Sequence, residues 1–198
     1  MNIEYDVITI ALVVLAVLIA VGWYLSYSAA RLDRLHAKVE GAVSVLDAQL
    51  VRRAEASLEL ATSGALDPAS SLFLADAATG AIQRRTEHPI GDDPLDGQHF
   101  AGRESVESAL TSALATILTE EQQTMLTGTS ADPLGQDALE RIEAAALRVQ
   151  LARRFHNDAV AEVRRVRSKR IVRGFRLAGH AALPETVDFD DRLPGGAA

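Results

Sequence analysis

The sequence predicts an all-α protein in which an N-terminal transmembrane helix continues into a long antiparallel four-helix bundle. Residues 7–27 form an apolar run without a charge, which is long enough to cross a bilayer. The rest of the chain carries apolar residues every three or four positions and shows no alternation long enough for a strand. Hydrophobic residues make up 48% of the chain but aromatic residues only 5%, which favours packed helices over a β-sandwich.

Residues 7–27 are interpreted as a single membrane-spanning helix after a short tail of residues 1–6. About 20 apolar residues in a helix cross a hydrocarbon core of about 30 Å. A cleaved signal peptide is the alternative, with Ser28-Ala29-Ala30 as its small-residue site. The acidic residues Glu4 and Asp6 favour the anchor, because a signal peptide needs a basic start.

The charges around the span predict its orientation. No lysine or arginine precedes it, whereas Arg31, Arg34 and Lys38 follow it closely. Because positive flanks stay in the cytoplasm, we expect a single-pass cell-membrane protein with its N-terminus outside and its bundle in the cytoplasm.

The bundle is predicted to occupy residues 28–178, followed by an irregular tail of residues 179–198. Its first helix continues the span and ends near Gly64, where glycine can cap it. Asp67-Pro68 predicts the start of the second helix, with an N-cap acid before a proline at the first helical position. The four bundle helices are expected at about residues 28–63, 68–87, 102–126 and 134–173.

Two stretches resemble the LemA family of bacterial membrane proteins. The first is Asp47-Ala48-Gln49-Leu50-Val51-Arg52-Arg53, and the second is Arg-Arg-Phe-His-Asn-Asp-Ala-Val within residues 152–160. The family patterns are Asp-Val-Gln-Leu-Lys-Arg-Arg and Arg-Arg-Phe-Tyr-Asn-Asp-Ala-Val. The resemblance implies an N-terminal anchor, a four-helix bundle, and neither an established biochemical activity nor agreed catalytic residues. His156 replaces the family's usual tyrosine, so the chain resembles a divergent member.

Both motifs carry polar residues that we expect to meet between the first and fourth helices. These helices should be adjacent and antiparallel, with Asp47 roughly opposite Phe155. An interhelical network that fixes the register, exposed pairs on the helix surface and a ligand site are the three interpretations. The candidate residues are Asp47, Gln49, Arg52, Arg53, Arg153, Arg154, Asn157 and Asp158.

The end of the fourth helix is strongly basic, although the chain carries a net charge of −7. An up-down-up-down topology returns this end to the membrane, where each cation gains about 1 kcal/mol from anionic lipid. Pairing with the loop acids Asp92, Asp93 and Asp96, or contact with an RNA or protein, are the alternatives. The candidate lipid-facing residues are Arg164, Arg165, Arg167, Lys169, Arg170 and Arg173.

Two further features are interpreted from the residues alone. Val187 and Phe189 in the tail either cover a groove of the bundle or belong to a disordered end. The pair Arg103-Glu104 is expected to be solvated on the surface of the third helix.

No pattern in the sequence indicates a reaction. The chain has no cysteine, no histidine pair with metal-ligand spacing and no glycine-rich phosphate loop. Its negative charge argues against general nucleic-acid binding. We therefore expect a non-enzymatic scaffold or interaction module without metal or cofactor, whose partners are the bilayer and an unidentified protein or a second copy. The alternative is an enzyme or a small-ligand-binding bundle with a polar site between the first and fourth helices.

Overall fold

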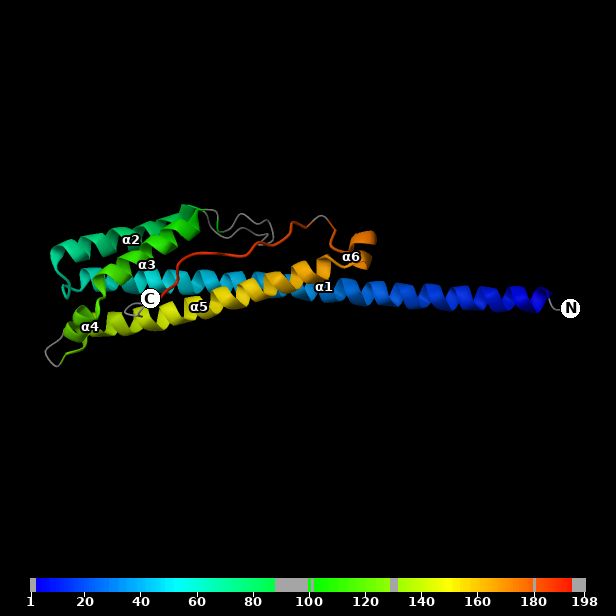
Figure 1. The fold of residues 1–198 in the computed structure, drawn as a ribbon, viewed down its shortest axis with the longest axis horizontal. Helices are drawn as coiled ribbons and strands as arrows, with labels where there is room; N and C mark the ends of the chain where they lie inside the picture. The colour runs from blue at the N-terminus through cyan, green and yellow to red at the C-terminus, as the bar shows by residue number, and fades with distance from the viewer. Residues whose placement is uncertain (1–2, 88–99, 101, 129–131, 180, 194–198) are drawn as a thin grey trace.

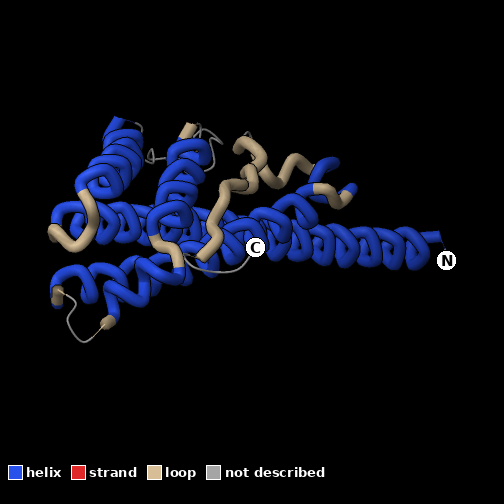
Figure 2. Tube along the Cα trace, turned by 60° about the vertical axis from the view of Figure 1, so that its left-hand side comes forward, coloured by secondary structure: helices blue, strands red, loops and turns tan. Residues whose placement is uncertain are grey.

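The computed structural model describes residues 3–87, 100, 102–128, 132–179 and 181–193. All regular secondary structure in these residues is helical, which confirms the all-α class (Figures 1 and 2). The helices are α1 (Ile3–Thr62), α2 (Pro68–Glu87), α3 (Arg103–Ile117), α4 (Glu120–Thr127), α5 (Pro133–Arg167) and α6 (Arg170–Gly174).

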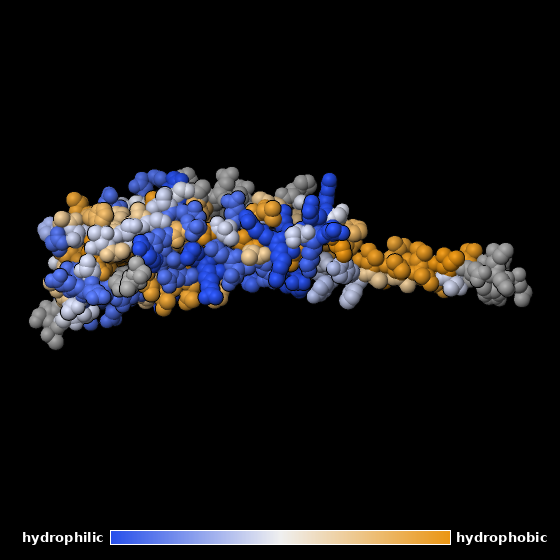
Figure 3. Space-filling view, viewed as in Figure 1, coloured by the Kyte–Doolittle hydropathy of each residue, from blue (hydrophilic) through white to orange (hydrophobic). Residues whose placement is uncertain are grey.

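Helix α1 runs without a break from the apolar run into the bundle, and it begins at Ile3, inside the tail expected at residues 1–6 (Figure 1). Its first half protrudes as a bare apolar rod (Figure 3). The most apolar 18-residue window has a mean hydropathy of 2.7 and none of it is buried by protein. Length, composition and the absence of a protein cover make α1 the candidate single membrane span of the described chain.

The turn from α1 to α2 follows the predicted capping chemistry. Gly64 adopts a left-handed φ of 83° beyond the last turn of α1. The carboxylate of Asp67 accepts hydrogen bonds from the backbone N–H groups of Ala69 (3.0 Å) and Ser70 (3.2 Å). A hydrogen bond from the Ser70 side chain is the main cause that lowers the pKa of Asp67 below its ordinary value, and the two backbone hydrogen bonds add to this effect. Helix α2 then covers the range expected from the sequence.

The third helix, expected to be continuous over about residues 102–126, is instead divided into α3 and α4. Leu118 leaves the helical region with φ −86° and ψ 59°. The hydroxyl of Thr119 accepts a hydrogen bond from the Gln122 N–H (3.3 Å) and so caps α4. Threonine is a stronger N-cap than interior helix residue, which accounts for the break.

The fourth helix was expected to reach residue 173 but ends at Arg167. Lys169 is extended, with φ −63° and ψ 135°, and the chain turns into the short helix α6. The turn buries Val172 against Leu32 and Val163, which a straight continuation of α5 would not place there. Burial of the Val172 side chain stabilises this turn. The N–H groups of Ser168 and Lys169 still donate to the carbonyls of Arg164 (3.0 Å) and Val166 (3.2 Å).

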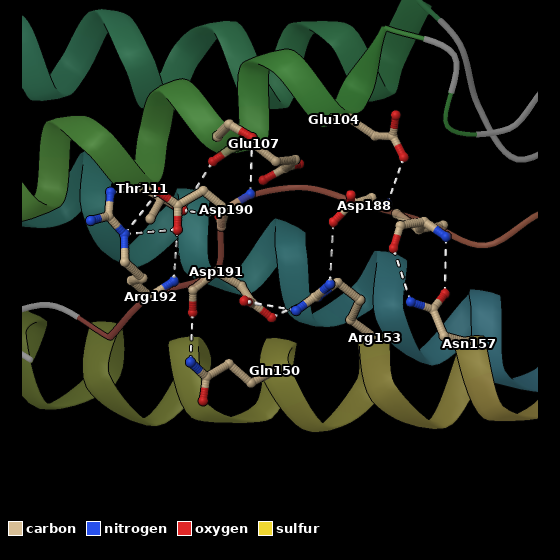
Figure 4. Close-up of polar contacts among 12 residues, drawn as sticks. Glu104, Glu107, Thr111, Gln150, Arg153, Asn157, Asp188, Asp190, Asp191 and Arg192 are labelled. Carbon is tan, nitrogen blue, oxygen red and sulfur yellow. Dashed lines mark hydrogen bonds and ion pairs between the residues drawn. The ribbon is translucent and has the colours of Figure 1, made fainter. Parts of the chain in front are cut away.

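Helices α1 and α5 are antiparallel neighbours along the whole bundle (Figure 1). Their register is marked by ion pairs between Lys38 and Glu162 (3.2 Å) and between Glu59 and Arg141 (2.7 Å). Helix α2 packs on α1, and α3 packs on α2. The fourth side of the bundle differs from a closed four-helix arrangement: residues 181–193, expected to be an irregular tail, lie extended between α3 and α5 (Figures 1 and 4).

The start of α5 depends on a glycine. A Cβ at Gly135 would lie 2.6 Å from the Cβ of Ala65 and 3.4 Å from Cδ2 of Leu126. We expect Gly135→Ala to lower the free energy of unfolding by about 1–3 kcal/mol through overpacking. Gly80→Ala is the control, because nothing lies within 4 Å of its Cβ and α2 should gain up to about 1 kcal/mol. Urea denaturation of both detergent-solubilised variants measures these changes. If the free energy of unfolding changed in the same direction in both variants, the close approach at Gly135 would be contradicted.

Candidate functional site

The predicted direct contacts between polar residues of the first and fourth helices do not form; these residues take part in two networks, which touch only through Thr111 and Asp190 of the described chain. The first joins α1 to α3 through a buried ion pair, in which Arg53 NH2 lies 2.9 Å from Oε2 of Glu107. Both side chains are only 1% exposed. The Arg53 guanidinium also donates to the Thr111 hydroxyl (3.0 Å) and to the backbone carbonyl of Glu107 (3.2 Å).

A second pair of charges extends this network toward α2. Asp47 accepts from Arg103 NH1 (2.5 Å) and from Arg85 Nε (3.3 Å). Arg103 NH2 also lies 3.5 Å from Oε1 of Glu107. Arg103 is 1% exposed, so the expectation that Arg103-Glu104 is a solvated pair is wrong for the arginine. Two arginines and two carboxylates thus balance their charges inside the α1–α2–α3 interface.

The α5 residues of the predicted network face residues 181–193 and not α1. Arg153 forms a bidentate pair with Asp191, at 2.7 Å from Nε to Oδ2 and 3.0 Å from NH2 to Oδ1 (Figure 4). The amide of Asn157 donates to the Val187 carbonyl (3.0 Å) and accepts from the Val187 N–H (2.9 Å). The buried ring of His156 places Nε2 3.2 Å from the Glu185 carbonyl.

The other members of the predicted network do not join either set. Arg52, Arg154 and Asp158 are exposed, and Gln49 is half-buried. None of the contacts made by the eight candidate residues connects the α1 set with the α5 set. The ligand site expected between the first and fourth helices is therefore not assembled by these residues.

Residues 181–193 occupy a groove walled by α3 and α5 and floored by α1. Val187 and Phe189 are 2% and 6% exposed and share a core with side chains of α1 and α5. The prediction that these two residues cover a groove of the bundle is therefore confirmed, and the alternative of a disordered end is wrong for them. The core side chains are Val43, Leu46, Leu50, Val149 and Ala152, together with Phe100.

The walls of this groove satisfy the backbone of the extended segment. On the α3 side, Glu104 and Ser108 accept from the N–H groups of Asp188 (2.7 Å) and Asp190 (3.1 Å). The Thr111 hydroxyl donates to the Asp190 carbonyl (2.6 Å). The sequence held a signal for this wall that our interpretation missed, since residues 104, 108 and 111 form one polar stripe at helical spacing.

The carboxylate of Asp190 closes the end of the segment. It accepts from Arg192 Nε (3.0 Å) and NH2 (2.7 Å). The hydrogen bond from Arg192 is the main cause that lowers the pKa of Asp190 below its ordinary value of 3.8, and the charge of Arg53 adds to it. The stabilisation from this ionised group is therefore present above about pH 4 and lost as the pH falls through the lowered pKa.

The basic residues near the end of α5 divide into two groups. Arg164 and Arg167 turn toward the extended segment, where they donate to the carbonyls of Pro184 (2.8 Å), Ala182 (2.6 Å) and Ala181 (2.7 Å). The side chains of the second group are exposed: Arg165, Lys169, Arg170 and Arg173. The alternative acids Asp92, Asp93 and Asp96 lie outside the described residues.

Two cavities lie in this basic region, next to the inner end of the apolar run. The smaller, of about 320 Å³, is lined by Tyr24, Tyr27, Ser28 and Arg31 of α1 and by residues 166 and 169–172. The larger, of about 1050 Å³, has Arg164, Arg167, Arg173 and Arg176 among its lining residues. Both therefore combine cationic groups with apolar or aromatic walls.

Among the described residues, no three His, Asp or Glu side chains gather as metal ligands would. Comparison of the chain with protein-family models, with curated proteins and with solved structures finds no match.

Proposed function

We propose that this chain is a divergent LemA-like scaffold of a bacterial cell membrane, with its N-terminus outside and its bundle in the cytoplasm. It has no enzymatic role in this proposal. Helix α1 anchors it as a single span, and the basic residues around α6 bind anionic lipid headgroups. The observation that carries the proposal is the cavity between Tyr24, Tyr27 and Arg31 of α1 and the residues Lys169 and Arg170 at the start of α6.

The composition of this cavity suits the membrane interface. Trp23 and Tyr27 lie with their ring centroids 6.5 Å apart at the inner end of the apolar run, which is the usual depth of aromatic side chains in bilayers. Ile171 and Phe175 of the α6 region are exposed apolar side chains that can enter the interface. Arg31, Lys169 and Arg170 then stand at the level of lipid phosphates, for which guanidinium and ammonium groups are suitable partners.

The structure changes which cations belong in the proposed lipid site. Arg164 and Arg167, predicted as lipid-facing, already donate to backbone carbonyls of residues 181–184. Their loss would disturb the docked segment as well as any lipid contact. Arg31, Lys169 and Arg170 line the cavity without such bonds, so they give the cleaner test.

We expect Arg31→Gln/Lys169→Gln/Arg170→Gln to weaken anionic-lipid binding on the order of a hundred-fold, at about 1 kcal/mol per cation. The measurement is a titration of the detergent-solubilised full chain with short-chain phosphatidylglycerol. Trp23, the only tryptophan, lies next to the cavity residue Tyr24 and reports binding by its fluorescence.

The matched control removes the same charge elsewhere. Arg52, Arg148 and Arg154 are exposed on the bundle away from the cavity, and their replacement by glutamine should leave the titration unchanged. Equal binding of phosphatidylcholine and phosphatidylglycerol by the wild type, or an equal loss in the control, would rule out the lipid site.

A second surface supports the role of an interaction module. One side of the α1–α5 pair carries the Lys38–Glu162 and Glu59–Arg141 ion pairs. Val45 lies between Lys38 and Glu59 at a spacing of multiples of seven residues, and Phe155 lies between Arg141 and Glu162 in the same way, so both are on this side. Val45 is 53% exposed and Phe155 65%. Exposed apolar side chains of this size at the middle of a helix pair favour contact with a protein partner or a second copy.

A further inference from the structure

The mode of docking of residues 181–193 is that of a bound peptide. The segment is extended, so successive side chains point in opposite directions. Val187 and Phe189 enter the core, whereas the side chain of Asp188 between them is 97% exposed. An extended ligand that places alternate side chains in pockets is a recurring form of peptide recognition.

Side chains from both walls of the groove form hydrogen bonds with the backbone of the segment (Figure 4). On the α5 side, Asn157 pairs with both polar groups of Val187, and Gln150 donates to the Asp191 carbonyl (2.7 Å). On the α3 side, Ser108 and Thr111 pair with the two polar groups of Asp190. Backbone contacts of this kind hold an extended chain regardless of most of its side chains.

Sequence preference comes from the pockets and from one arginine. Arg153 binds the Asp191 carboxylate through two parallel hydrogen bonds, and its guanidinium lies 5.7 Å from the centroid of the Phe189 ring. A bidentate arginine discriminates a carboxylate strongly from a neutral group. The groove therefore prefers an apolar residue at position 187, a large apolar residue at 189 and an acidic residue at 191. Arg153 NH1 also lies 3.7 Å from Oδ1 of Asp188, which favours an acidic residue at that exposed position.

The groove is held open by contacts that do not involve the segment. On one side of it, the buried pair of Arg53 and Glu107 fixes α3 on α1. Beyond its ends, α1 and α5 meet in two other cores, one around Leu60 and Ile142 and one around Leu32 and Val163. The distance between the walls is therefore set largely by the bundle itself, as in a preformed binding site.

We propose that the α1–α3–α5 groove is a binding site for an extended acidic peptide of a partner protein, and that residues 187–191 are its internal occupant. The partner segment has the chemistry of Val-Asp-Phe-Asp-Asp and displaces this occupant. The proposal specifies the interaction-module part of the proposed function and is independent of lipid binding, so the peptide and lipid titrations fail separately.

A linked occupant competes at high effective concentration, on the order of millimolar for a short connection. The wild type should therefore bind an added peptide weakly. Substitutions that loosen the internal segment without touching the groove should strengthen binding of the same peptide. This opposite response of segment and groove variants separates a recognition site from a purely structural packing contact.

The test uses the full chain in detergent and a fluorescein-labelled peptide with the sequence of residues 183–193. In the opened variant Phe189→Ala/Asp191→Ala, we expect peptide affinity at least about ten-fold above that of the wild type. A peptide with the same two alanines should not bind. Fluorescence anisotropy measures the affinities, and the thermal melt followed by circular dichroism shows that the variant is folded.

Groove variants supply the second arm. Adding Arg153→Gln or Asn157→Ala to the opened variant should return peptide affinity to the wild-type level or below. Arg148→Gln, at an exposed position of α5 that lines a hollow against α1 and not this groove, should leave it unchanged. If the opened variant loses its cooperative melt, Asp191→Asn replaces it, because this change keeps the apolar contacts and loosens only the arginine pair.

Three results would overturn the proposal. The first is a folded opened variant that binds no peptide, and the second is binding that persists in the Arg153→Gln groove variant. The third is a dimer in which residues 181–193 exchange between two copies, because the second occupant would then be this chain and not a partner.

Discussion

Arg53→Ala should lower the free energy of unfolding by about 3–5 kcal/mol, because it removes the closer of the two cations that compensate the buried carboxylate of Glu107. Glu107 is 1% exposed, and the only cations near it are Arg53 at 2.9 Å and Arg103 at 3.5 Å among the described residues. The Thr111 hydroxyl would also lose its donor. Urea denaturation of the detergent-solubilised chain, followed by circular dichroism, measures the change.

The control for this prediction removes both charges together. Arg53→Met/Glu107→Leu replaces the pair with apolar side chains of similar volume, a change that is often neutral or stabilising for buried ion pairs. We expect the double variant to recover most of the loss, although Arg103 then keeps only Asp47 as its buried partner. A single variant that loses less than about 1 kcal/mol, the value of an exposed pair, would contradict the burial of this network.

Leu46→Ala should cost about 2–5 kcal/mol, the range for truncating a buried leucine. The Leu46 side chain is fully buried in the core that joins α1 and α5 to the docked Val187 and Phe189. A cavity there weakens both the helix pair and the floor of the groove. The same denaturation experiment gives the loss.

The neighbouring residue provides a matched control for Leu46. Val45 is 53% exposed, and Val45→Ala in the middle of α1 should change stability by less than about 0.5 kcal/mol, because exposed substitutions away from special features have small effects. Comparable losses at positions 45 and 46 would show that α1 does not present the described face to α5.

The end of α1 and the start of α2 were predictable because each rests on a local signal. Glycine at 64 and the Asp67-Pro68 pair act through backbone groups within a few residues. The break at Thr119 and the early end of α5 depend on competition between a helix and tertiary burial, exemplified by Val172. The helical pattern of apolar residues continues through both positions, and it carries no information about tertiary burial.

The polar residues of the two motifs were expected to contact one another, but in the structure they pair with other residues. Arg53 and Arg153 were expected in one network between the first and fourth helices, yet each pairs with an acidic residue outside that network, Glu107 and Asp191. Periodicity gives the face of a helix on which a residue lies but not the element that covers this face. A segment without helical periodicity, residues 181–193, covers the α5 face, so no pattern of the four predicted helices revealed it.

The unbroken course of α1 has a mechanical consequence. A helix without a joint transmits torsion, so the rotation of the bundle about the axis of α1 is coupled to that of the apolar first half of this helix. Each residue inserted between the two halves would turn one against the other by about 100° and lengthen the rod by about 1.5 Å. In the proposed membrane topology, the side from which a peptide would approach the groove is thus fixed by whatever orients α1 within the plane of the bilayer.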